Sequence, residues 1–74
     1  MSKRTHLIQA RERLMLTRPQ LAKQLGIGRV AVYRVEEGMR DPSAALMRRW
    51  VKKLGPGASM DLFKKPPQIA DAAE

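Results

Sequence analysis

The chain has 74 residues, a formal net charge of +8 at pH 7 and no cysteine. A chain of this length can form one small domain, and without cysteine it contains neither a disulfide bond nor a thiolate metal site. Because His6 is the only histidine, we expect no metal site and no cofactor. The sequence also lacks a glycine-rich phosphate loop and a credible set of nucleophile, histidine and acid, so we predict that the protein is not an enzyme.

The positive charge is concentrated in the first three quarters of the chain. Residues 1–55 contain 13 Lys and Arg and 4 acidic residues. Residues 56–74 contain only 2 Lys and Arg but 3 acidic residues. Such a surplus favours nucleic acid, because binding releases the counterions condensed on it. Charge alone does not separate DNA from RNA or from an acidic membrane surface.

The sequence has no apolar run close to the roughly 20 residues that span a bilayer. Its first residues, MSKRTHLIQARER, contain no hydrophobic segment of the kind found in signal peptides. We therefore expect a cytoplasmic protein with no membrane partner.

The first predicted elements are a basic arm and an amphipathic helix. We expect residues 1–5 to form a flexible arm and a helix to run from about Thr5 or His6 to Met15. Its inward side chains recur at helical spacing, namely Leu7, Ile8, Arg11, Leu14 and Met15.

The second predicted helix begins after Thr17 and ends at Gly26. The segment Thr-Arg-Pro-Gln forms a capping box, in which Thr17 and Gln20 exchange side-chain to backbone hydrogen bonds. The inward residues are Leu21, Ala22 and Leu25, and Ala22 is small enough to let another helix cross closely.

The third predicted helix spans about residues 28–37, with Gly28 as an acceptable N-cap. Its inward residues are Ala31, Val32 and Val35. Core packing poorly explains the opposite face, which holds Arg29, Val30, Tyr33 and Arg34.

The fourth predicted helix spans about Ser43–Leu54 and is stopped by Gly-Pro-Gly. Trp50 is in phase with Leu46 and Leu54, so we assign it to the core and not to base stacking. Residues 58–64 could form a short fifth helix, and we expect residues 65–74 to be a disordered tail beyond a domain of residues 6–64.

These positions resemble the helix-turn-helix of the Cro and lambda-repressor family, also called XRE-type regulators. The resemblance covers about Leu7 to Gly55 and is carried by Arg11, Thr17, Leu21, Ala22, Leu25, Gly26, Val32, Val35, Glu36, Gly38, Pro42 and Leu54. It implies an all-α, compact bundle of four to five helices of the lambda-repressor-like DNA-binding type. It also implies a salt bridge between Arg11 and Glu36 that sets the angle of the third helix.

The resemblance assigns DNA bases to the outward face of the third helix, that is, to Arg29, Val30, Tyr33 and Arg34. We expect phosphate contacts from Arg18, where the family commonly has glutamine, and from Gly28, Arg40, Lys3 and Arg4. Each of the basic residues among these also has an ordinary explanation as surface charge.

The sequence thus predicts a bacterial or phage transcription regulator on the nucleoid, most simply a repressor that binds double-stranded operator DNA as a homodimer. Leu62, Phe63 and the outer part of the fourth helix are candidates for the dimer surface. Two alternatives remain open. The tail could bind a protein partner, as in an antitoxin, or the chain could be a nonspecific basic nucleic-acid binder.

Overall fold

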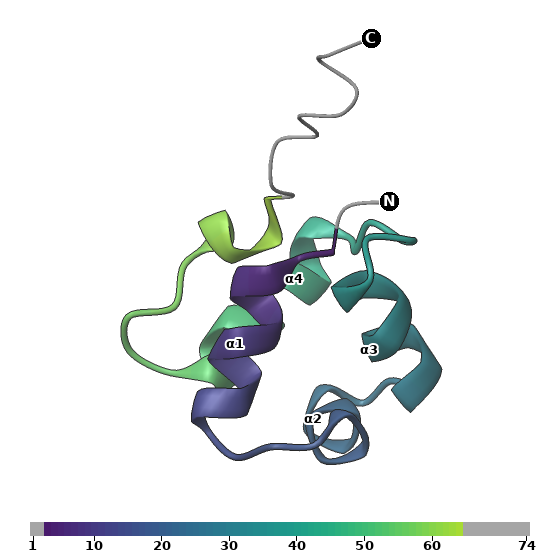
Figure 1. Cartoon of the computed structure of the whole chain (residues 1–74), viewed down its shortest axis with the longest axis horizontal. Helices are drawn as coiled ribbons and strands as arrows, with labels where there is room; N and C mark the ends of the chain where they lie inside the picture. The colour runs from purple at the N-terminus through teal and green to yellow at the C-terminus, as the bar shows by residue number, and fades with distance from the viewer. Residues whose placement is uncertain (1–2, 65–74) are drawn as a thin grey trace, which may run out of the picture.

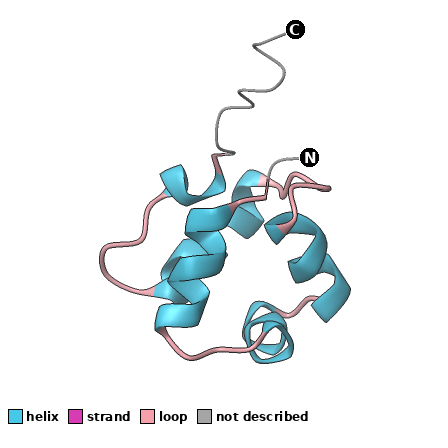
Figure 2. Ribbon diagram, in the orientation of Figure 1, coloured by secondary structure: helices cyan, strands magenta, loops and turns pink. Residues whose placement is uncertain are grey.

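The computed structural model describes residues 3–64, and all regular secondary structure in that range is helical. Four α-helices, α1 (Thr5–Arg13), α2 (Arg18–Leu25), α3 (Arg29–Glu36) and α4 (Ala44–Leu54), are followed by the 3-10 helix η1 (Met60–Phe63). Figure 1 shows α1 crossing the molecule between η1 and the α2–α3 pair, and Figure 2 shows the short loops that join the helices. The predicted all-α fold is confirmed, while Met1, Ser2 and the predicted tail, residues 65–74, lie outside the described residues.

The helix boundaries follow local capping signals. The predicted capping box of α2 is present, because Thr17 Oγ1 accepts from the Gln20 amide at 3.2 Å and Gln20 Oε1 accepts from the Thr17 amide at 2.8 Å. Gly26 then takes a left-handed conformation with φ 74°, and the Ile27 amide donates to the Ala22 carbonyl at 3.0 Å. This hydrogen bond closes the sharp turn between α2 and α3.

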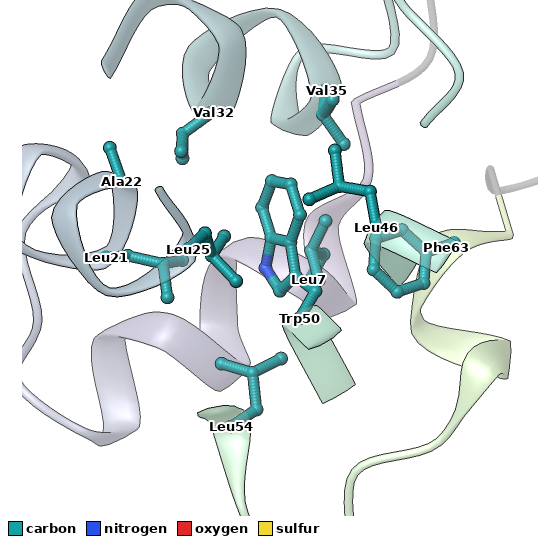
Figure 3. Close-up of a cluster of buried hydrophobic side chains, with 10 residues drawn as sticks. All are labelled: Leu7, Leu21, Ala22, Leu25, Val32, Val35, Leu46, Trp50, Leu54 and Phe63. Atoms are coloured by element: carbon teal, nitrogen blue, oxygen red, sulfur yellow. The ribbon is translucent and has the colours of Figure 1, made fainter. Parts of the chain in front are cut away.

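The core is a single apolar cluster around Trp50, which is fully buried (Figure 3). The Phe63 ring meets the Trp50 ring edge to face, with centroids 5.5 Å apart and an interplanar angle of 88°. The assignment of Trp50 to the core is confirmed. Phe63 is only 6% exposed, so its prediction as a dimer-surface residue is wrong, because its ring completes the core.

The end of α1 differs from the sequence prediction. The helix stops at Arg13, and Leu14 and Met15, both predicted to point inward, are 45% and 89% exposed. Met15 has φ 57°, and the Leu16 amide reaches back to the Arg11 carbonyl at 3.3 Å. This left-handed turn points Met15 outward and places Leu16 against the core instead.

Arg4 is not part of a flexible arm, because its side chain is buried and every nitrogen of its guanidinium donates a hydrogen bond. Nε donates to the Phe63 carbonyl at 2.6 Å, and Nη1 donates to the carbonyls of Val35 and Arg40 at 2.8 and 3.0 Å. Nη2 pairs with the Asp41 carboxylate. The predicted phosphate contact by Arg4 is therefore wrong. Its guanidinium joins the start of α1 to the end of α3, the following loop and η1.

Replacement of Arg4 tests this assignment. Arg4→Ala leaves buried carbonyl groups without a donor, and we expect it to lower the free energy of unfolding by roughly 2–4 kcal/mol. Urea unfolding followed by Trp50 fluorescence measures the change. Lys3→Ala is the matched control, since the Lys3 side chain is 64% exposed, and equal stability of the two variants would contradict a structural role for Arg4.

Met15 gives a second test, because few side chains favour a left-handed backbone. Met15→Gly should raise the free energy of unfolding by about 1 kcal/mol, since glycine relieves the steric cost and the exposed Met15 side chain contributes little burial. Glu12→Gly, inside α1, is the control and should lower stability by a similar amount. A lower melting temperature for Met15→Gly would show that the turn is not strained.

Candidate nucleic-acid interface

The outward face of α3 brings together the side chains predicted to contact bases. Val32 and Val35 are fully buried against the core, so the opposite side of the helix faces solvent. That side exposes Val30 by 52% and Tyr33 by 43%, and its other members are the exposed residues Arg29 and Arg34.

Arg29 and Arg34 retain uncompensated positive charge. Among residues 3–64, neither guanidinium forms an ion pair with a carboxylate, although Arg4, Arg11 and Arg18 all do. An exposed guanidinium with no internal partner can donate two parallel hydrogen bonds to an external acceptor. The two arginines of α3 are thus chemically available for an anionic or base-edge ligand.

Glu36 connects α3 to both preceding helices. Its fully buried carboxylate accepts from Arg11 Nε at 2.7 Å and Arg11 Nη2 at 3.3 Å. The predicted Arg11–Glu36 salt bridge is therefore present. The same carboxylate also accepts from Arg18 Nε at 2.8 Å, a contact that the sequence analysis missed.

Arg18 lies at the start of α2, with its side chain 35% exposed. Its Nη2 is 3.8 Å from Glu37 Oε2, and its guanidinium carbon lies 5.1 Å from the centroid of the Tyr33 ring. The hydrogen bond with Glu36, aided by the charges of Glu36 and Glu37, raises the pKa of Arg18 although burial acts in the opposite direction. No local pattern in the sequence indicates these contacts, because Glu36 lies 18 positions away from Arg18.

A groove of about 740 Å³ separates the α1–α2 turn from the outward face of α3. Its apolar wall is formed by Met15, Leu16, Pro19, Val30 and Tyr33, with the guanidinium groups of Arg18 and Arg29 beside it. Apolar side chains next to guanidinium groups suit a ligand that carries both methyl groups and hydrogen-bond acceptors, as base edges do.

The other predicted phosphate contacts lie at exposed backbone or loop positions. Gly28 is the N-cap of α3 with φ −77°, no side chain caps the helix there, and a Cβ at Gly28 would meet nothing within 4 Å. Arg40 is exposed in the loop after α3, with its carbonyl held by Arg4. Lys3 is near Glu37, with Nζ 3.8 Å from Oε1.

Residues 3–64 contain neither a candidate metal cluster nor a candidate membrane-spanning helix. No group of three histidine, cysteine, aspartate or glutamate side chains in that range could hold a metal ion. In the same range, no helix is long and apolar enough to cross a membrane.

Comparison with known families gives one match. Residues 7–56 match a family model described as helix-turn-helix, and this range runs from within α1 to just beyond the end of α4. No curated protein and no solved structure matches the chain.

Loss of Arg11 should destabilise the fold, because it removes the main partner of a buried carboxylate. We expect Arg11→Ala to lower the free energy of unfolding by about 3 kcal/mol and to reduce DNA binding through partial unfolding. Arg13→Ala, at an exposed position of the same helix, should melt within a few degrees of the parent chain. An unchanged melting midpoint for Arg11→Ala would contradict a stabilising role for Arg11.

Proposed function

Because the chain belongs to the Cro and lambda-repressor (XRE-type) helix-turn-helix family of DNA-binding transcription regulators, we propose that it is a repressor that reads a palindromic operator as a homodimer. In this proposal α3 enters the major groove of double-stranded DNA, and α2 lies across its mouth. The observation that carries the proposal is the outward face of α3, where Arg29 and Arg34 are exposed and have no carboxylate partner among residues 3–64.

Each side chain on that face has a chemical role in the proposal. Arg29 and Arg34 donate paired hydrogen bonds to the O6 and N7 atoms of guanine. Val30 packs on a thymine methyl group, and the Tyr33 hydroxyl reaches a base edge or a neighbouring phosphate. The groove next to Val30 and Tyr33 leaves both side chains accessible to base edges.

Phosphate contacts would fix the register of α3 on the duplex without selecting a sequence. We assign them to the exposed backbone N–H at Gly28, where no Cβ obstructs the approach, and to the side chains of Arg40 and Lys3. The backbone of the loop at Arg40 is held by Arg4, whose Nη1 donates to the Arg40 carbonyl at 3.0 Å.

The small number of base pairs that one α3 helix can read supports a dimer. One helix reads only a few base pairs, and two symmetry-related helices about 34 Å apart can enter successive major grooves on one face of DNA. With Phe63 in the core, the remaining candidates for the dimer surface are Leu62, which is partly buried, and the outer part of α4.

Selection from a random duplex library tests the proposal directly. The recovered duplex and a scrambled control would be titrated at about 150 mM salt, with an expected preference of at least roughly a thousandfold for a palindromic sequence. Equal affinities that fall together as salt rises would identify a nonspecific nucleic-acid binder and contradict the proposal.

The same operator then tests the two arginines. Arg29→Ala and Arg34→Ala should each cost about 1–3 kcal/mol of binding free energy and relax selectivity at particular base pairs. Arg13→Ala, at an exposed position of α1, is the control and should preserve the pattern of selectivity. Uniform weakening on every duplex by the α3 variants would place both arginines on phosphates instead of bases.

A further inference from the structure

We propose that Arg18 determines specificity by positioning Tyr33, and that it does not serve as a phosphate clamp. The proposal rests on the proposed function, in which Tyr33 meets a base edge. It replaces the sequence-based expectation for Arg18. The contacts of Arg18 connect the buried Glu36 carboxylate to Tyr33, an exposed side chain on the outward face of α3.

The Arg18 guanidinium is fixed by two carboxylates. Its Nε donates to Glu36 Oε1 at 2.8 Å, and its Nη2 faces Glu37 Oε2 at 3.8 Å. Glu36 is itself held by two hydrogen bonds from Arg11. The Arg18 guanidinium is therefore held in place by these carboxylates, although Arg18 lies at the exposed start of α2.

The fixed guanidinium in turn restrains the Tyr33 ring. The Arg18 guanidinium carbon is 5.1 Å from the ring centroid, within the range of a cation–π contact. Tyr33 is 43% exposed, so packing covers only part of its ring. The contact with Arg18 favours the rotamer that lies along the groove, and this sets where the phenol hydroxyl is presented.

A phosphate contact by Arg18 would have to compete with these partners. Counterion release from DNA is driven by cationic groups whose charge is not already neutralised. Arg18 faces the charges of Glu36 and Glu37, whereas Arg40 pairs with no carboxylate among residues 3–64. Arg18 should therefore contribute little to the salt dependence of binding, and Arg40 should contribute more.

The test is a double-mutant cycle with Arg18→Gln, Tyr33→Ala and the double variant, each titrated on the selected operator and on its single-base variants at several salt concentrations. We expect Arg18→Gln to lose discrimination at the same base pairs as Tyr33→Ala. The two effects should be non-additive by about two- to fivefold. The slope of log affinity against log salt should stay unchanged for Arg18→Gln.

Arg40→Gln is the matched control. It should weaken binding to all duplexes alike and reduce the salt slope by about 0.9 for each phosphate that the variant no longer neutralises. The same uniform behaviour in Arg18→Gln would overturn the proposal and restore the phosphate role. Additive effects of Arg18→Gln and Tyr33→Ala would also overturn it.

Two measurements on the protein without DNA show whether Arg18→Gln acts by unfolding the chain or by changing the surroundings of the Tyr33 ring. Thermal melting checks that Arg18→Gln remains folded, as expected because Arg11 still neutralises Glu36. Tyr33 is the only tyrosine, so its ring signals in a proton NMR spectrum are identified by residue type, and they should shift in Arg18→Gln but not in Arg40→Gln. Unshifted ring signals would overturn the positioning role. Absence of any preferred duplex for the parent chain would instead refute the proposed function.

Discussion

The buried carboxylate of Glu36 is the constraint on which the arrangement of the helices depends. A carboxylate removed from water is costly unless oppositely charged hydrogen-bond donors surround it. Here the donors come from Arg11 in α1 and Arg18 in α2, while Glu36 itself belongs to α3. Because all three side chains meet at this carboxylate, the contact links the orientation of α3 to both preceding helices. The apolar core supplies the main driving force for folding, and Glu36 selects one orientation of α3 within it.

The fold could be predicted to a large extent because most of its signals are local. The capping box of α2, the left-handed turn at Gly26 and the apolar stripe containing Trp50 each depend on residues within a few positions of one another. The exposed set on α3 follows in the same way from helical periodicity. The Arg11–Glu36 salt bridge spans 25 positions, and it was predictable only through the resemblance to a family in which such a pair occurs.

The features that the sequence did not reveal depend on contacts between distant segments. Arg4 resembles any other basic residue near a chain end, yet its acceptors at Val35 and Phe63 lie 31 and 59 positions away. Nothing in the local pattern indicates that backbone carbonyls gather there. Periodicity likewise extended α1 to Met15, whereas the chain must reverse earlier to place Arg18 beside Glu36. The second role of Arg18 could not be found before the three helices were placed together.

The Arg4 contacts have a consequence for where the folding unit ends. The family match stops at residue 56, but Arg4 precedes that match and Phe63 follows it. Their hydrogen bond joins the two margins of the domain, and the Phe63 ring packs against Trp50 in the core. A fragment cut at the limits of the shared family segment would lack both partners. The contacts that hold this domain together therefore extend beyond the matched segment, to residues 4 and 63.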